Sequence, residues 1–281
     1  MPAKRVELLP LHQYDLAVVA LSGGKDSVGC LLHLLEQGYP LHKVRAIHHD
    51  VDGHDRPFMD WPVTADYCRK LCEALAVTLR FSWRQGGFLR EMLRDSSATG
   101  AIVMETSDGI KETGGRGPAG RRLQFPQVSA NLSVRWCSAA LKIDVGRSVF
   151  ANDPEFANKK ILFLTGERAE ESSARAKYLD AELHHSTAPT KGRIIHQWRP
   201  VLHWPEAQVW EIIQRWRINP HPGYRLGWGR ISCMTCIFGD KDQWRSVQEL
   251  APAECKQIAD FEVQFGKTIH RKDSVLVQAS K

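Results

Sequence analysis

Short apolar runs alternate with amphipathic stretches along most of the chain. Residues 16–21 form a continuous apolar run, which is typical of a strand buried on both faces. An apolar period of helical spacing follows over residues 28–35. Strands that alternate with helices predict an α/β fold built on a doubly wound parallel sheet of five strands. The same alternation predicts further strands at 43–50, 77–83, from 159 onward and within 193–202, and helices at about 62–76, 87–93, 134–150 and 205–216.

One long stretch breaks this alternation. Residues 95–131 are dominated by glycine, arginine and polar side chains, a composition typical of a mobile insertion or lid.

At 281 residues the chain is long enough to bury a sizeable core. We therefore expect one main domain over residues 1–217 and a cysteine-containing, helical C-terminal appendage over residues 218–281.

A polar loop connects the first predicted strand to the first predicted helix. Backbone N–H groups and the positive end of the helix dipole meet at such a junction, which suits an anion. Its glycines let the backbone approach a phosphate, its lysine adds positive charge, and its serines offer hydroxyl groups. The spacing is not that of a Walker A loop, because the two glycines and the lysine are consecutive. The loop consists of Ser22, Gly23, Gly24, Lys25, Asp26 and Ser27.

A second polar loop, residues 165–175, follows the strand predicted from residue 159. Arg168 and Arg175 suit bidentate binding of phosphate. Glu170 and Glu171 suit Mg²⁺ or a ribose. The alternative is a helix start on the surface whose charges pair with one another. In the usual strand order 3-2-1-4-5 the two loops follow neighbouring strands, so one ATP molecule can touch both.

Both loops resemble those of one superfamily. SGGKDS after a buried strand resembles the pyrophosphate loop of the adenine nucleotide alpha-hydrolase superfamily, whose members cut ATP between the α and β phosphates. GERAEESSAR resembles the Gly-x-Arg-x-x-x-Ser-x-x-Arg stretch of phosphoadenosine-phosphosulfate reductases and of the phosphorothioation ATP pyrophosphatases related to them. The resemblance extends over residues 16–238, and it implies a Rossmann-type sheet that binds ATP and Mg²⁺.

The resemblance also implies roles for individual residues. It implies that Lys25, Asp26 and Arg168 are catalytic. It implies that the nucleotide is bound by the six residues of the first loop together with Asp50, Gly166, Arg168, Glu171, Ser172 and Arg175.

The sequence contains seven cysteines, of which three are candidates for sulfur or metal chemistry. Cys137, Cys233 and Cys236 suit a [4Fe–4S] cluster better than zinc, because zinc needs a fourth ligand such as His221. A redox pair or a persulfide on Cys233 or Cys236 is the main alternative, and three buried structural cysteines are the simplest one.

Two further expectations concern the other thiols and the state of the first candidate. Cys68 and Cys72 share one face of a predicted helix with two leucines, which favours core packing. Cys137 lies between Arg135 and Lys142 in the sequence, and we expect these cations to favour its thiolate.

The formal net charge of +6 allows a polyanionic partner. Arg116, Arg121 and Arg122 lie in the predicted insertion, and with Arg135 they are candidates for binding nucleic acid. No stretch has the features of a signal peptide or of a membrane span, so we expect a cytoplasmic protein without a membrane partner.

These observations predict an ATP pyrophosphatase of the sulfurtransferase type. ATP would adenylate an oxygen of a nucleic acid, and sulfur delivered through the cysteines by a cysteine desulfurase or another donor would displace AMP. DNA phosphorothioation is the favoured reaction and tRNA thiolation the second. The alternatives are a non-catalytic nucleotide-binding module and a phosphoadenosine-phosphosulfate or adenosine-phosphosulfate reductase. The reductase is less favoured because the tail lacks the Glu-Cys-Gly-x-His nucleophile of that branch and Cys255 is followed by Lys-Gln.

Overall fold

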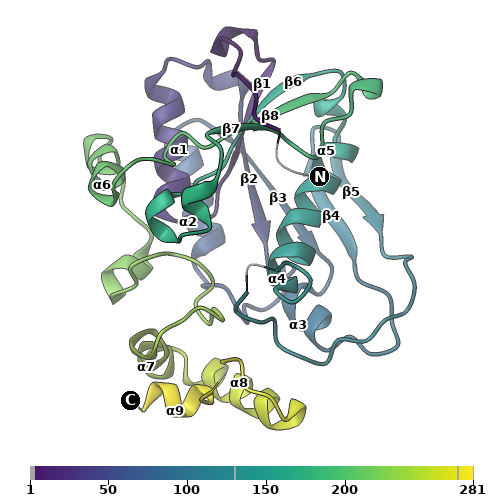
Figure 1. The fold of residues 1–281 in the computed structure, drawn as a ribbon, viewed down its shortest axis with the longest axis vertical. Coiled ribbons are helices and arrows are strands. Elements are labelled where there is room, and N and C mark those ends of the chain that lie inside the picture. Colours follow the sequence, from purple (N-terminus) through teal and green to yellow (C-terminus); the bar gives the residue numbers. More distant parts are fainter. Residues whose placement is uncertain (1–3, 130, 271, 281) are drawn as a thin grey trace.

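The computed structural model describes residues 4–129, 131–270 and 272–280. Within these residues the strands form a single eight-stranded sheet in the order β5-β4-β3-β2-β1-β6-β8-β7 (Figure 1). The strands are β1 (Leu16–Ala20), β2 (Val44–Asp50), β3 (Thr78–Arg84), β4 (Ala101–Thr106), β5 (Gly109–Gly114), β6 (Lys160–Leu164), β7 (Ala181–Leu183) and β8 (Ile194–Trp198).

The centre of the sheet confirms the predicted α/β fold. Strands β3, β2, β1, β6 and β8 are neighbours in that order and pair in parallel. They are the five strands expected from the sequence, in the order 3-2-1-4-5. The strand order reverses between β1 and β6, so the loops after these two strands share the switch point where such sheets bind ligands.

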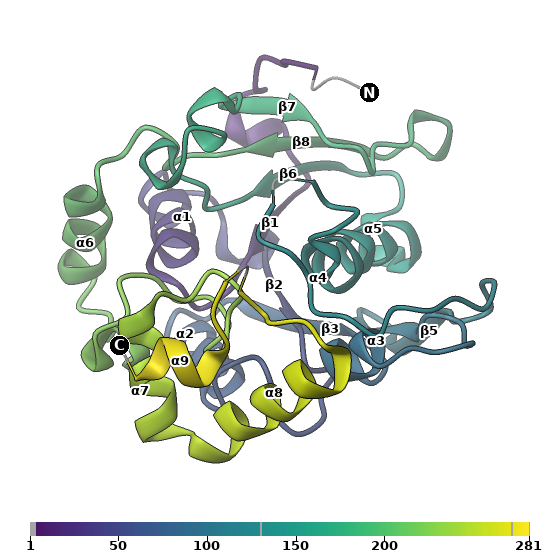
Figure 2. The ribbon, with the colours of Figure 1, turned by 60° about the horizontal axis from the view of Figure 1, so that its bottom comes forward.

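Helices cover both faces of this sheet (Figure 2). In β1, Ala17 and Val19 pack into the core beneath α1, α2 and α6, whereas Leu16 and Val18 pack into the core beneath α5. This alternation follows from the two-residue period of a strand and explains why the run is apolar throughout. These helices are α1 (Lys25–Glu36), α2 (Thr64–Ala74), α5 (Asp144–Asn152) and α6 (Glu206–Arg215).

Part of the predicted insertion forms two strands, which the sequence pattern did not predict. That this segment is a mobile insertion or lid stays a prediction. β4 and β5 form an antiparallel hairpin that extends the sheet beyond β3. Ile102 and Met104 of β4 are buried in the core beneath α5, whereas β5 is mostly exposed and polar. The polar edge strand obscured the apolar one in the sequence pattern. Ala130, in the same predicted insertion, lies outside the described residues.

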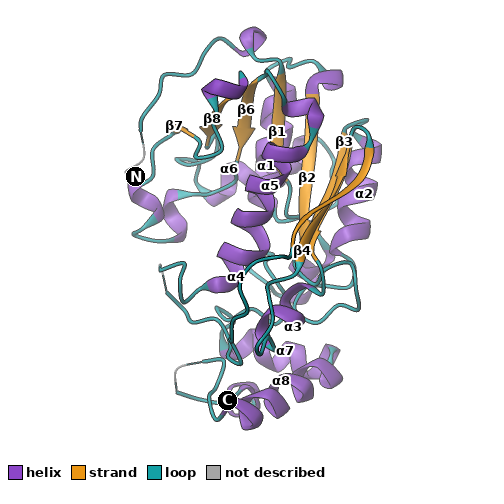
Figure 3. Cartoon of the chain, turned by 90° about the vertical axis from the view of Figure 1, so that its right-hand side faces the viewer, coloured by secondary structure: helices purple, strands orange, loops and turns teal. Residues whose placement is uncertain are grey.

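The C-terminal part is helical, as predicted. It forms a layer beneath the carboxyl ends of the parallel strands, visible at the lower end of Figure 3. Its side chains share a core with Phe58, Phe88 and Trp136 from the rest of the chain. The division at residues 217 and 218 stays a prediction. No helix in the described ranges is long and apolar enough to cross a membrane. The remaining helices are α3 (Gly87–Met92), α4 (Trp136–Ser138), α7 (Lys241–Leu250), α8 (Pro252–Phe265) and α9 (Val275–Ala279).

Candidate active site

The loop between β1 and α1 is a tight turn closed by its own serines. Ser27 Oγ donates a hydrogen bond to the Gly24 carbonyl (2.8 Å) and accepts one from the Ser22 N–H (3.2 Å). Gly23 has a φ of +81°, in the left-handed region that favours glycine. A Cβ on Gly24 would lie 3.0 Å from the carbonyl oxygen of Ile231. The backbone conformation at position 23 and the close approach at position 24 therefore both favour glycine.

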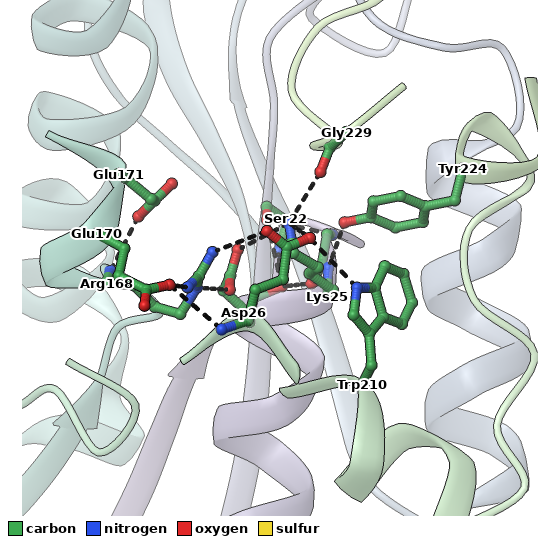
Figure 4. Close-up of polar contacts among 12 residues, drawn as sticks. Ser22, Lys25, Asp26, Arg168, Glu170, Glu171, Trp210, Tyr224 and Gly229 are labelled. Carbon is green, nitrogen blue, oxygen red and sulfur yellow. Dashed lines mark hydrogen bonds and ion pairs between the residues drawn. The ribbon is translucent and has the colours of Figure 1, made fainter. Parts of the chain in front are cut away.

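Lys25 is 3% exposed and lies at the first position of α1. Its backbone N–H donates to the hydroxyl of Tyr224 (2.7 Å), and its Nζ donates to the carbonyl of Gly229 (2.9 Å). Nζ also lies 3.4 Å from Glu206 Oε1, beside the ring of Trp210 (Figure 4). The groups that would bind a phosphate at this helix end already have partners in the same chain, so a phosphate has to replace them.

Asp26 and Arg168 join the two predicted loops. Arg168 Nε donates to Asp26 Oδ1 at 2.6 Å, across the switch point between β1 and β6. A Cβ on Gly166 would lie 2.7 Å from the backbone of Asp26 and Ser27, so glycine allows the loops to approach this closely. Burial raises the pKa of Asp26, although Lys25 and Arg168 oppose this shift.

The glutamates of the second loop hold its arginines. Besides Asp26, Arg168 contacts Glu170 Oε2 (2.6 Å) and Glu206 Oε2 (3.6 Å). Burial disfavours the charged guanidinium, but these carboxylates raise the pKa of Arg168 nonetheless.

The rest of the second loop is held in the same manner. Glu171 accepts hydrogen bonds from the Arg168 N–H (2.9 Å) and from the Arg175 side chain, and Ser172 Oγ accepts one from the Arg175 N–H (3.2 Å). Across the described ranges, no group of three or more His, Cys, Asp or Glu side chains is arranged to hold a metal ion. A magnesium ion at these loops therefore depends on nucleotide phosphates for further ligands.

Asp50 ends β2 and lines a cavity of about 210 Å³, whose wall also includes His48 and Thr64. Its Oδ1 accepts a hydrogen bond from the Asp52 N–H (2.9 Å), and its Oδ2 lies 3.2 Å from His54 Nδ1. Asp52 accepts the N–H groups of residues 58–60 and fixes the loop that forms the cavity wall. Burial raises the pKa of both Asp52 and Asp60 to about 6.

Cys137, Cys233 and Cys236 are brought to the same place, at the edge of the C-terminal core, and each is half-buried. All three lie within electrostatic range of the Lys142 ammonium. The sequence prediction grouped these three thiols although almost a hundred residues separate Cys137 from Cys233. Cys68 and Cys72 are buried in the core between α2 and the sheet, which confirms their structural role.

Lys142 lies in a π-helical turn, Ala139–Ile143, between α4 and α5. Turns of this kind are rare in proteins overall, but those that occur are often found at functional sites. The Lys142 side chain is exposed to water, although many protein atoms lie around its ammonium group. Removal from bulk water disfavours its charge, but Cys233, Asp60 and the other two thiols raise its pKa.

The expectation that nearby cations favour the Cys137 thiolate is wrong for this fold. Burial raises the pKa of the Cys137 and Cys233 thiols, and Lys142 opposes this only in part. The described residues also do not present a preformed zinc or [4Fe–4S] site. His221 is not a free fourth ligand, since its Nδ1 accepts from the Gly223 N–H (3.1 Å) and its Nε2 lies 3.2 Å from Thr64 Oγ1.

One protein-family model matches a part of the chain that contains the second loop. Residues 153–238 match the model of the phosphoadenosine phosphosulfate reductase domain family. The chain is 25% identical over 262 residues to the uncharacterized 37.8 kDa protein in the gpa 5′ region of Escherichia phage 186, covering 87% of this chain and 74% of that protein.

Two solved structures have a partial likeness to the chain. The phosphoadenylyl-sulfate (PAPS) reductase from Candida auris, in a phosphate complex, has a TM-score of 0.44 and 14% identity, with 79% of this chain and 83% of that chain covered. The FMN adenylyltransferase from Candida glabrata, in complex with FAD and inorganic pyrophosphate, has a TM-score of 0.40 and 12% identity, with 78% and 55% covered.

The family match includes the loop of Arg168 and the pair Cys233 and Cys236, and it ends at Phe238. It supports a nucleotide-utilizing enzyme domain and the resemblance to the adenine nucleotide alpha-hydrolase superfamily. It does not separate the phosphorothioation branch from the reductases. The match begins after the loop 22–27, so the case for that loop depends on its own residues and packing.

Proposed function

We propose that the protein cleaves ATP to AMP and pyrophosphate and adenylates an oxygen of a nucleic acid, which then accepts sulfur. The observation that carries this proposal is the ion pair between Asp26 and Arg168, which joins two phosphate-type loops at the switch point of the sheet. DNA is the favoured acceptor and tRNA the second.

The residues of the first loop would act on the departing pyrophosphate. The acceptor oxygen attacks the α phosphorus, the bond to the β phosphate breaks, and pyrophosphate leaves. The α1 N-terminus and Lys25 would hold the pyrophosphate, and Arg168 would offset the charge that develops between the phosphates. Catalysis by such a site comes mainly from positioning and charge neutralisation. Mg²⁺, when bound to the phosphates, supplies further charge neutralisation.

The cysteines would act in the second half of the reaction. A persulfide carried on one cysteine attacks, through its terminal sulfur, the phosphorus or carbon atom that carries the adenylated oxygen, and AMP leaves with that oxygen. A second thiol then attacks the inner sulfur, which releases the thiolated acceptor and leaves a disulfide for an external reductant. Cys236 lies within electrostatic range of both Cys137 and Cys233, which supports a shared role. No step depends on an iron–sulfur cluster or zinc.

The test is product analysis with ATP and Mg²⁺, with and without DNA or tRNA. We expect pyrophosphate release that is faster when the acceptor is present, with AMP appearing as the adenylated acceptor is hydrolysed or receives sulfur. ADP and inorganic phosphate as products would contradict the proposal. Tight ATP binding without any product would instead identify a non-catalytic nucleotide-binding module.

A phosphoadenosine-phosphosulfate or adenosine-phosphosulfate reductase is the second candidate. It is favoured by the reductase-domain match over residues 153–238, and a sulfonucleotide presents the same kind of phosphate to the two loops. Cys255 is 1% exposed, so an attacking thiol would have to be Cys137, Cys233 or Cys236. Release of sulfite from either sulfonucleotide with a dithiol donor, without ATP cleavage, would establish this activity.

A further inference from the structure

Two arginines converge on one exposed aromatic ring beside the cysteines. Phe238 is 41% exposed. The guanidinium carbon of Arg135 lies 6.0 Å from the centre of this ring, and that of Arg230 lies 5.4 Å from it. The two cations are therefore at most about 11 Å apart. Contact with the ring face stabilises each guanidinium in place.

Among the described residues, neither guanidinium forms an ion pair with a carboxylate. The Nε atom of Arg135 is buried and has no hydrogen-bond partner in this part of the chain. A buried donor without a partner costs free energy, and a guanidinium is best satisfied by a carboxylate or a phosphate. The arrangement therefore suits an anion.

The other candidate arginines differ in this respect. Arg122 pairs with Glu91 at 3.2 Å and its guanidinium packs on the ring of Trp136, so its role is structural. Arg121 pairs with Asp95 at 3.4 Å. Unlike Arg121 and Arg122, Arg135 forms no ion pair among the described residues.

Chain proximity fixes the position of this anion site. Arg135 precedes Cys137 by two residues, Arg230 precedes Cys233 by three, and Phe238 follows Cys236 by two. Because a residue spans at most about 3.6 Å, each member is within roughly 11 Å of a cysteine along the backbone. A phosphate at this site would lie near the thiols, and the backbone on either side of Arg230 contacts Lys25 and Gly24 of the loop 22–27.

We propose that Arg135, Arg230 and Phe238 form a second phosphate site, which holds the phosphodiester backbone of the acceptor nucleic acid next to the cysteines. This inference rests on the proposed function and names its acceptor class. Phosphate groups also occur on sulfonucleotides, and the two sources are distinguished by which probe depends on the arginines.

The test measures binding of fluorescent single-stranded DNA, duplex DNA and tRNA to the full-length protein at several salt concentrations. In R135A/R230A, we expect at least about 10-fold weaker binding, because each arginine contributes charge-assisted hydrogen bonds. The slope of log affinity against log salt should decrease by about 1.5 for two lost phosphate contacts. R135K/R230K should retain most of the salt slope. The matched control is Arg225→Ala, because Arg225 is exposed on the same segment and its side chain contacts Asn219.

Unchanged DNA and RNA affinity in the double variant, or an equal loss in Arg225→Ala, would overturn the proposal. A loss confined to adenosine 3′-phosphate 5′-phosphosulfate would also overturn it and assign the site to a small nucleotide. Thermal unfolding checks that each variant is folded. AMP release by the unmodified protein tests the proposed function independently, since its failure would leave the oligonucleotide result standing.

Discussion

The phosphate loop and the cysteine cluster are connected by one stretch of chain, residues 222–236, but their charges are arranged in opposite ways. At the loop, Lys25 and Arg168 both face carboxylates. At the cysteines, Arg135 and Arg230 face none among the described residues. The cations of the first region must exchange partners to bind a ligand, whereas the two arginines of the second have no carboxylate partner among the described residues.

The connecting stretch links the two regions mechanically. Tyr224 and Gly229 contact Lys25, and the Ile231 carbonyl packs against Gly24. Cys233 follows two residues later. A phosphate that displaces Tyr224 and Gly229 must move this stretch, so we expect nucleotide binding to change the position of the Cys-x-x-Cys pair.

Substitution of the three clustered cysteines should have the largest effect, and it should affect sulfur transfer but not ATP binding. Cys137→Ser, Cys233→Ser and Cys236→Ser should each reduce sulfur transfer to background, because a hydroxyl does not carry a persulfide. ATP affinity should change by less than about twofold, since the nucleotide loops contain none of these residues. The measurements are transfer of labelled sulfur to an oligonucleotide and calorimetric titration with ATP.

Cys72→Ser is the matched control for these variants. Its thiol is 1% exposed in the core, so the substitution should lower stability by about 1–3 kcal/mol through burial of a hydroxyl and leave transfer by the folded protein intact. Normal transfer in all three cysteine variants, or loss of ATP binding in a folded one, would contradict the division of roles.

Lys25→Ala and Asp26→Ala should damage the other region. Lys25 provides the cation at the helix end, and Asp26 holds Arg168, so AMP formation should fall by about 100- to 1,000-fold, as for removal of one transition-state donor. AMP release is measured at saturating ATP. Lys70→Ala, which removes an exposed lysine paired with Asp66, should have no effect. Full activity in both loop variants would remove the basis for the proposed catalytic roles.

Local patterns were sufficient to predict most of the fold. The five parallel strands and both loops follow from apolar periodicity and from the glycines and charges at strand ends, and the strand order is the usual one for a doubly wound sheet. The hairpin of β4 and β5 was missed because its outer strand is polar and exposed, so it lacks the pattern of a half-buried strand.

Contacts between distant segments were beyond the reach of local patterns. Tyr224 meets Lys25 across 199 positions, and Gly229 meets it across 204. Neither residue type signals a phosphate loop. The state of Cys137 was mispredicted for a related reason, because the sequence shows neighbouring charges but not the burial that outweighs them.

Tyr224→Phe tests whether the partners of the loop 22–27 compete with a bound phosphate. The variant removes the hydroxyl that accepts the Lys25 N–H, so a phosphate no longer competes for this donor. ATP affinity should rise about 2- to 10-fold, the equivalent of one neutral hydrogen bond. Tyr178→Phe serves as the control because Tyr178 is 41% exposed and packs against Arg199. Weaker ATP binding in Tyr224→Phe would show that the hydroxyl is itself a nucleotide ligand.

The smallest expected effect concerns Asp60, whose charge affects the Lys142 ammonium near the cysteines. Burial raises the pKa of Asp60 to about 6, above the value of about 3.9 for an exposed aspartate. Between these values the folded protein binds more protons than the unfolded chain, so the contribution of Asp60 to stability falls as the pH rises from about 4 to 6 and is constant above that.

Asp60→Asn should therefore flatten the pH dependence of the unfolding free energy by about 1–2 kcal/mol over this window, measured by urea denaturation. Asp66→Asn is the control, since Asp66 is exposed on α2 and pairs with Lys70. An unchanged profile in Asp60→Asn would mean that Asp60 is ionised throughout and that Lys142 has a permanent carboxylate nearby. In that case the cysteine region would resemble the phosphate loop in its charge pairing, and the contrast between them would be limited to the two arginines.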